Sequence, residues 1–134
     1  MIPTLVLDTN ALISLFKDAD SPVRHHLMKA GRLVIPLISY GEFMVGVENQ
    51  QNALKPELKM LEELLQTPNT EVHLPTRETA RIYARIYNQL RKQGTPIPTG
   101  DIWIAAETME AKGTLYSADG HFEHVPLLDW IDGR

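Results

Sequence analysis

The amino-acid sequence predicts an α/β fold, a three-layer sandwich in which a mostly parallel central sheet is flanked by helices. Short apolar runs alternate along the chain with longer segments that have helical periodicity. The apolar runs are continuous, as in parallel strands that are covered on both faces. The chain has 134 residues, of which 43% are hydrophobic, and it lacks repeats and linkers. We therefore expect residues 1–134 to form a single domain with one substantial core.

The N-terminal third is expected to contain one strand followed by two helices. Residues 2–7 form a short apolar run that suits a buried strand. Residues 9–16 and 21–30 have helical periodicity, and the second segment carries typical start and stop residues. These are Ser21 at the cap, Pro22 in the first turn and Gly31 just past the end.

The middle third continues the alternation. Residues 33–35 are expected to form the second strand and residues 72–74 the third. Between them, residues 37–48 form a helix that is apolar around most of its circumference, and residues 51–66 form an amphipathic helix. Pro56 marks a break or a fresh start in the latter because proline disrupts a helix interior.

The C-terminal third begins with a long helix that Thr76 caps and that reaches Gln93 before Gly94 ends it. The next helix opens at Asp101, a residue type that favours the N-cap position, where its charge suits the positive end of the helix. The last two strands are expected at residues 114–117 and 125–128.

The composition excludes several classes of protein. No apolar run approaches the ~18 residues of a membrane span, and the N-terminus lacks the features of a signal peptide, so we expect a cytoplasmic protein. The absence of cysteine rules out disulfides and thiolate metal sites. A net charge of −4 argues against a broadly basic nucleic-acid-binding coat, although a local basic surface beside an acidic site stays open.

Two acidic residues follow expected strands. Asp8 comes directly after residues 2–7, and Asp119 comes two residues after the strand that ends at Ser117. The carboxyl ends of parallel strands meet at one edge of a sheet, where ligand sites form, so both side chains should lie at that edge. Taken singly, each acid is also common where a strand gives way to a turn.

Glu42 is harder to explain by structure alone. The helix over residues 37–48 leaves one narrow stripe free of large apolar side chains, which Glu42 shares with Ser39 and Gly46. Residues 33–54 contain no Lys or Arg to neutralise the carboxylate. A buried charge needs a partner, and the small neighbours should leave room for a cation.

Carboxylates gathered at one sheet edge would repel one another strongly. Two unit charges ~5 Å apart at an effective dielectric of ~20 cost about 3 kcal/mol. Stability alone therefore does not favour such a cluster. Oxygen ligands suit Mg²⁺ or Mn²⁺, and the chemistry that follows is metal-assisted phosphodiester hydrolysis, in which the metal activates water.

The ordered set of motifs resembles the PIN-domain ribonucleases, and in particular the VapC-type toxins of bacterial and archaeal toxin–antitoxin pairs. The resemblance covers essentially the whole chain. It rests on Asp8-Thr9-Asn10 after an apolar strand, on Glu42 in the third helix, on GDIWIAA at residues 100–106 and on SADGHF at residues 117–122.

The resemblance implies a PIN-like fold and a catalytic site for Mg²⁺ or Mn²⁺. It further implies an endoribonuclease that cleaves structured RNA such as transfer or ribosomal RNA, with a small antitoxin protein as partner and a homodimeric assembly. Many relatives have Asn before the third acid, where this chain has Gly100, which puts a substrate contact in doubt. The implied catalytic and metal-binding residues are Asp8, Glu42, Asp101 and Asp119, with Asn10 and Ser117 as polar supports.

Other functions stay open. An RNA-processing PIN nuclease without a toxin role, or an inactive PIN-fold binding module, would share the fold, although the presence of all four acids counts against the second. A phosphatase with an aspartyl nucleophile would need a D-x-D pattern, which Asp8-Thr9-Asn10 lacks.

Several other polar residues have simpler structural interpretations. Arg77, Arg81 and Arg85 share one face of the long helix opposite its apolar stripe, and such a face is usually solvated. We expect His121 to be a local hydrogen bonder and Phe122 a packing residue.

Overall fold

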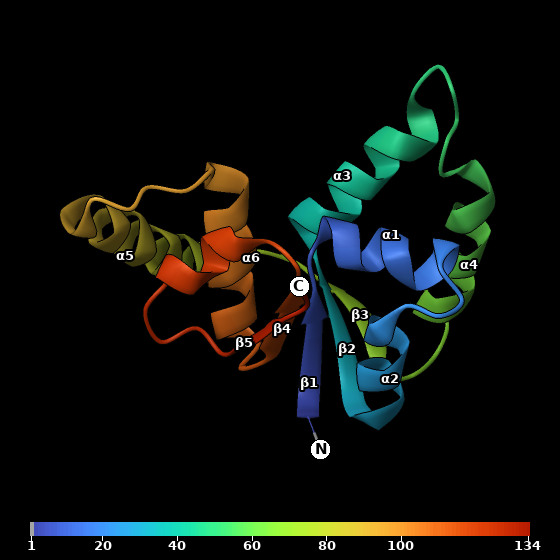
Figure 1. Cartoon of the computed structure of the whole chain (residues 1–134), viewed down its shortest axis with the longest axis horizontal. Helices are drawn as coiled ribbons and strands as arrows, with labels where there is room; N and C mark the ends of the chain where they lie inside the picture. The colour runs from blue at the N-terminus through green and yellow to red at the C-terminus, as the bar shows by residue number, and fades with distance from the viewer. Residues whose placement is uncertain (1) are drawn as a thin grey trace.

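The computed structural model describes residues 2–134 and confirms the α/β sandwich around a five-stranded central sheet (Figure 1). The strand order is β3-β2-β1-β4-β5, and every neighbouring pair is parallel. All carboxyl ends therefore meet at one edge of the sheet. The strands are β1 (Ile2–Leu7), β2 (Ala30–Pro36), β3 (Thr70–His73), β4 (Thr114–Ser117) and β5 (Trp130–Asp132).

Helices cover both faces of the sheet, with α1 to α4 on one side and α5 and α6 on the other (Figure 1). None of the helices within residues 2–134 is both long enough and apolar enough to cross a membrane. The helices are α1 (Thr9–Lys17), α2 (Pro22–Lys29), α3 (Leu37–Glu48), α4 (Lys55–Leu65), α5 (Arg77–Gln93) and α6 (Thr99–Glu110), followed by the short 3-10 helix η1 (Gly120–His124).

Strand β1 connects two hydrophobic cores because its successive side chains point to opposite faces. Leu5 and Leu7 pack among the helices α1 to α4, whereas Val6 packs with α5 and α6. All three side chains are fully buried. Leu7 pairs with Tyr116 of β4, so the residues that follow the two strands emerge side by side.

The long helices match the sequence-based prediction closely. Helix α3 has the predicted bounds, and α5 runs from its cap residue Thr76 to Gln93. The Thr76 hydroxyl accepts hydrogen bonds from the first turn of α5, and Gly94 ends the helix in the left-handed conformation with φ +74°. Both ends of α5 were therefore recognisable from local chemistry.

Two predicted helix boundaries are wrong. Gly31 does not end α2 but lies within β2, which begins at Ala30 because the pairing with β1 extends to Ile2. Residues 51–54 are not helical, and α4 begins only at Lys55. Pro56 then lies in the first turn of α4, where no hydrogen-bond donor is lost.

The predicted third and last strands are also displaced. Strand β3 ends at His73 and leaves out Leu74. Residues 125–128 are not a strand, and Leu127 has the left-handed φ of +65°. The last strand is instead Trp130–Asp132, which pairs with β4 in parallel.

Candidate active site

Asp8 follows the last residue of β1 and is buried, with 6% of its surface exposed. Its Oδ1 accepts a hydrogen bond from the backbone N–H of Ala11 at 2.9 Å, which makes Asp8 the N-cap of α1. Its Oδ2 accepts a hydrogen bond from the hydroxyl of Ser117. The carboxylate is therefore held in one orientation by partners from two elements.

Ser117, the last residue of β4, connects Asp8 to Asp119. It is fully buried, and its hydroxyl oxygen also accepts a hydrogen bond from the backbone N–H of Asp119 at 2.9 Å. The Oδ1 of Asp119 in turn accepts the backbone N–H of His121 at 2.9 Å and caps η1. One buried hydroxyl thus fixes the relative positions of two acids from opposite ends of the chain.

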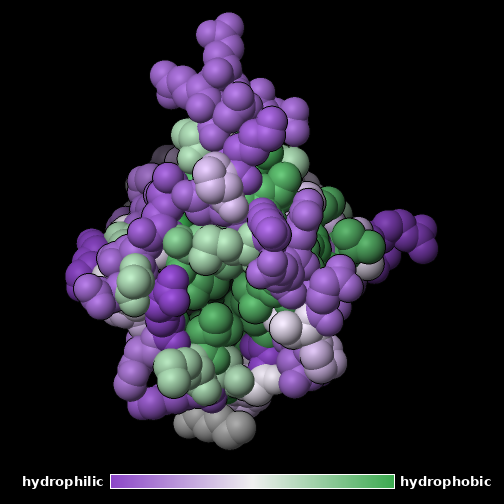
Figure 2. All heavy atoms as spheres, turned by 90° about the vertical axis from the view of Figure 1, so that its right-hand side faces the viewer, coloured by the Kyte–Doolittle hydropathy of each residue, from purple (hydrophilic) through white to green (hydrophobic). Residues whose placement is uncertain are grey.

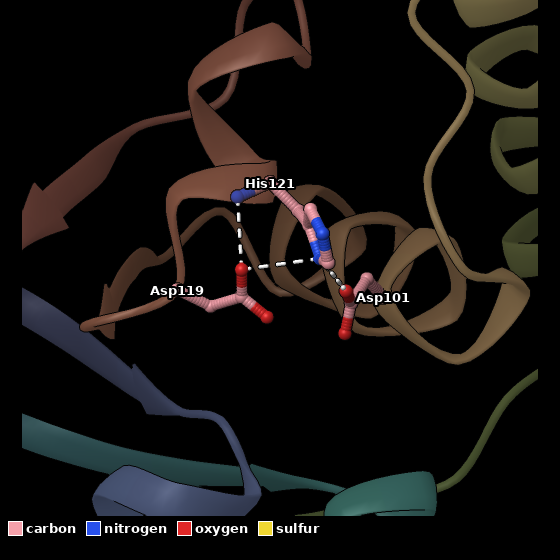
Figure 3. Close-up of side chains that lie close together, drawn as sticks. All are labelled: Asp101, Asp119 and His121. Atoms are coloured by element: carbon pink, nitrogen blue, oxygen red, sulfur yellow. Dashed lines mark hydrogen bonds and ion pairs between the residues drawn. The ribbon is translucent and has the colours of Figure 1, made fainter.

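Asp101 approaches the same edge from the first turn of α6. This helix begins at Thr99 after the N-cap residue Pro98, so the expectation that Asp101 occupies the N-cap is wrong. Its Oδ2 lies 2.9 Å from Nδ1 of His121, and the same nitrogen lies 3.1 Å from Oδ1 of Asp119 (Figure 3). The imidazole ring therefore bridges the two carboxylates.

Glu42 lies on α3, which follows β2 without a loop. It is exposed, and its Oε1 accepts a hydrogen bond from the hydroxyl of Thr9 at 2.5 Å. The expected stripe of small residues beside it does not leave room for a ligand. Ser39 is fully buried, and a Cβ added at Gly46 would come within 2.4 Å of Leu54 Cδ1. Exposure, and not a small-residue pocket, makes the Glu42 carboxylate accessible.

The carboxylates influence one another electrostatically. Burial raises the pKa of the Asp8 carboxyl, and the charges of Asp119 and Asp101 raise it further. Burial also raises the pKa of Asp101. The negative charges of Asp119 and Glu42 raise the same pKa by smaller amounts. Desolvation has a larger effect than the mutual repulsion that sequence reasoning emphasised. The ionised forms of Asp8 and Asp101 are therefore disfavoured by their surroundings.

His121 carries the nearest positive charge when its ring is protonated. Its hydrogen bond to Asp101 raises the pKa of the imidazole, and Asp119 adds to the effect. Phe122, which is 1% exposed, anchors the same short helix in the core, as predicted. Sequence reasoning missed the contact of His121 with two candidate metal ligands. Its position two residues after Asp119 was the available signal.

The donor atoms fit a divalent cation. Asp101, Asp119 and His121 each present one ligand atom, and these atoms all lie within 4.8 Å of one another. The carboxylates of Asp8 and Glu42 add oxygen atoms, the donor type that Mg²⁺ and Mn²⁺ prefer in proteins. A bound cation would offset both the desolvation and the repulsion of these carboxylates.

The structure brings Ser117, but not Asn10, into hydrogen-bonding distance of the acids. Asn10 is exposed in the first turn of α1, and no hydrogen bond among residues 2–134 joins it to the site. The neighbouring Thr9 makes such a contact instead, a role that sequence reasoning missed within the same motif.

A Cβ at Gly100 would meet only Ile38 Cδ1, at 3.8 Å, so a larger residue would fit there.

Comparison with known sequences identifies similar proteins along the whole chain. Residues 5–128 match the family model described as PIN domain. Ribonuclease VapC1 of Haemophilus influenzae strain R2866 is 30% identical over 131 residues, which cover 95% of this chain and 96% of that protein. Ribonuclease VapC1 of Methanocaldococcus jannaschii is 28% identical over 123 residues, which cover 90% of this chain and 80% of that protein.

Solved structures share the fold. The structure of VapBC-1 from nontypeable Haemophilus influenzae superposes with a TM-score of 0.81 at 27% identity, covering 97% of this chain and 98% of that chain. VapBC2 from Rickettsia felis, bound to a DNA fragment from its promoter, gives a TM-score of 0.79 at 19% identity, covering 96% and 97% of the respective chains. The second likeness concerns the fold alone.

Proposed function

Because this chain belongs to the PIN-domain family, we propose that it is an endoribonuclease that depends on Mg²⁺ or Mn²⁺. The observation that carries the proposal is the convergence of carboxylates from β1, α3, α6 and the end of β4 at one edge of the sheet. The residues that would hold the metal are Asp8, Glu42, Asp101 and Asp119.

The protein's own side chains prepare this site for a phosphodiester. Ser117 orients Asp8 and Thr9 orients Glu42, each through a hydrogen bond to the carboxylate. A bound divalent ion would supply Lewis acidity, activating water and stabilising the charge that develops on the phosphate oxygens. The similarity to relatives named ribonucleases supports RNA as the substrate, and structured RNA such as transfer or ribosomal RNA is the class that we propose.

Cleavage of RNA by the purified protein tests this function. We expect defined cuts in structured RNA with Mg²⁺ or Mn²⁺, and no cuts with EDTA. Asp101→Asn should abolish cleavage, whereas Asp129→Asn, a matched change at an exposed acid, should leave it intact. Full activity of Asp101→Asn would refute the assignment of the site, and metal-independent cleavage would refute the metal requirement.

We also propose that the nuclease is a cytoplasmic toxin restrained by a small antitoxin protein. The similar solved structures are described as VapBC assemblies, which supports a partner of this kind. A shallow apolar groove of about 370 Å³ between α1, α2 and α4 offers a place for an apolar helix of the antitoxin. Figure 2 shows hydrophobic side chains gathered on this side of the molecule. The groove is lined by Leu15, Phe16, Arg24, Leu27, Met60, Glu63, Leu64 and Thr67.

Growth assays test the toxin and the groove separately. Expression alone should arrest growth, and co-expression of the neighbouring antitoxin gene should rescue it. Met60→Glu, at a residue in the groove that is 41% exposed, should prevent rescue while RNA cleavage persists. Met28→Glu, at an 85% exposed methionine outside the groove, is the matched control and should still be rescued. Harmless expression of an active enzyme would instead favour an RNA-processing nuclease.

The family resemblance also supports a homodimer, which we propose as the assembly in solution. Light scattering coupled to gel filtration should then give twice the chain mass of 15.1 kDa. A mass equal to that of one chain would contradict this assembly.

A further inference from the structure

The imidazole of His121 lies within hydrogen-bonding distance of two acids of the candidate metal site. Its Nδ1 lies 2.9 Å from Asp101 Oδ2 and 3.1 Å from Asp119 Oδ1 (Figure 3). Adjacent ligands of an octahedral ion with bonds of about 2.1 Å are separated by about 3.0 Å. Both distances from Nδ1 therefore match the spacing of neighbouring ligands around one cation, and the three atoms all lie within 4.8 Å of one another.

The ring is held in this place by the fold and not only by the acids that it contacts. The backbone N–H of His121 is bound by Asp119 Oδ1 at 2.9 Å, which fixes the first turn of η1. The next residue, Phe122, is almost fully buried in the core on the α5–α6 side of the sheet. The side chain of His121 is 49% exposed, so the ring lies at the surface, where a cation with its water ligands can approach it.

We propose that Nδ1 of His121 is a nitrogen ligand of the cation held by Asp101 and Asp119, and that it gives this site a preference for Mn²⁺ over Mg²⁺. The inference rests on the proposed metal-dependent function and names a ligand that the acids alone do not supply. Imidazole nitrogen suits transition metals, whereas Mg²⁺ demands oxygen ligands. A metal bound at Nδ1 would take the place of any proton on that nitrogen, which would pass to water, and the neutral ring would carry its proton on Nε2.

A different role for His121 makes the opposite prediction. If the ring were only a cation that neutralises the two carboxylates, it would compete with a metal ion for them. Its removal would then strengthen the binding of both Mg²⁺ and Mn²⁺. If the ring is a ligand, its removal weakens the binding of Mn²⁺ and lowers the Mn²⁺/Mg²⁺ affinity ratio.

Metal binding to the purified protein separates the two roles without any measurement of activity. In titration calorimetry, His121→Ala should weaken Mn²⁺ binding at least about tenfold and change Mg²⁺ binding much less. Pulsed electron paramagnetic resonance of bound Mn²⁺ should detect directly coordinated ¹⁴N in the parent and not in His121→Ala. His124→Ala, a matched change at an exposed histidine of the same short helix, should behave as the parent.

The outcomes also distinguish this inference from the proposed function. Mn²⁺ that binds the parent without ¹⁴N coupling, or that binds His121→Ala as tightly as the parent, would overturn the nitrogen ligand alone. A parent that binds neither Mn²⁺ nor Mg²⁺ would overturn the metal site and the ligand together. Asp101→Asn, which removes an oxygen ligand and keeps His121, should weaken the binding of both ions.

Discussion

At the scale of single residues, hydroxyl and imidazole groups hold the acids of the candidate site in place: Ser117 contacts Asp8, Thr9 contacts Glu42 and His121 contacts Asp101. The positions of Asp8 and Asp119 after strands indicated which edge of the sheet they share, because the carboxyl ends of parallel strands converge. Which hydroxyl or ring would hold each acid depends on side chains far apart in sequence. Thr9 and His121 were therefore recognised only in the folded chain.

Ser117→Ala should destabilise the protein and weaken the site together. The buried hydroxyl donates to Oδ2 of Asp8 and accepts from the backbone N–H of Asp119, and its loss removes the Ser117 partner from both atoms. An unpaired buried polar group costs about 1–3 kcal/mol. Urea unfolding should show a loss of this size, and RNA cleavage should fall by about 10- to 100-fold if orientation of the carboxylates matters. Unchanged cleavage would mean that Ser117 has no supporting role.

Asp101→Asn should separate metal binding from helix capping. Because Asp101 lies inside α6 and not at its N-cap, the substitution removes no cap interaction. Burial raises the pKa of this carboxyl, so a neutral amide should leave the metal-free protein at least as stable at pH 8. Mn²⁺ at ~100 times its dissociation constant should stabilise the parent by about 2.7 kcal/mol and the variant much less. Thermal melts with EDTA or Mn²⁺ provide the measurement, and an equal metal response in both proteins would remove Asp101 from the site.

At the scale of helices and strands, prediction succeeded where an element carries its own signals. Helix α5 has a capping threonine, a terminal glycine and a continuous apolar stripe, so its ends follow from local sequence. Strand β5 has three residues, and its place is set by the pairing of Ile131 with Tyr116 and by the hydrogen bond from Trp130 Nε1 to the Ser117 carbonyl. The more apolar residues 125–128 were mistaken for this strand because those contacts are tertiary.

Helix α3 depends on a carboxylate from another helix. It has no side-chain cap of its own, and Glu107 of α6 accepts the backbone N–H of Leu37 at 3.0 Å in its first turn. The same oxygen lies 2.9 Å from His73 Nδ1 at the end of β3, and Glu107 is 1% exposed. Helix α6 therefore positions α3, and with it the candidate ligand Glu42.

Glu107→Ala should lower the free energy of unfolding by about 2 kcal/mol because the partly buried groups of Leu37 and His73 lose a common hydrogen-bond partner. Glu107→Gln keeps an acceptor oxygen of the same shape and should lose less. Glu62→Ala, at an exposed glutamate of α4, serves as the control and should change stability by less than about 0.5 kcal/mol. Chemical unfolding in urea measures all three, and a Glu107→Ala variant as stable as Glu62→Ala would contradict this role.

At the scale of the whole molecule, the α/β sandwich and its parallel sheet followed from the alternation of apolar runs and helical segments. The net charge of −4 gave no sign of how the acids are distributed. Sequence reasoning attributed the electrostatic strain to repulsion, whereas burial has the largest effect on Asp8 and Asp101. Burial of this kind depends on how two layers of helices enclose the sheet edge, which no local pattern specifies.

The metal-free protein should lose stability as the pH rises. The pKa values of Asp8 and Asp101 are raised from 3.8, and that of Glu107 from 4.5, so the folded state binds more protons than the unfolded state. The contribution of these three carboxyl groups to stability is largest below their pKa values in the unfolded chain. It is lost as the pH rises through their pKa values in the folded protein. The pKa of the His121 imidazole is raised from 6.5. Its contribution to stability is therefore fully present below pH 6.5 and is lost as the pH rises through the raised pKa.

Urea midpoints measured in EDTA between pH 5 and pH 9 should therefore decline towards high pH, and saturating Mn²⁺ should reduce the decline. The pKa of Asp132 is lowered to about 2 by its contacts with Arg134, so this acid acts in the opposite direction but only in strong acid. A midpoint that rises across this range in EDTA would be inconsistent with the raised pKa values.

The hydrogen bond between Ser117 and Asp8 spans 109 positions of the chain. During synthesis Asp8 therefore leaves the ribosome 109 residues before Ser117, and η1 and Asp119 follow later still. A nascent or prematurely terminated chain that lacks β4 has no site at all. The topology thus delays the appearance of the proposed nuclease site until β4 and η1 have left the ribosome.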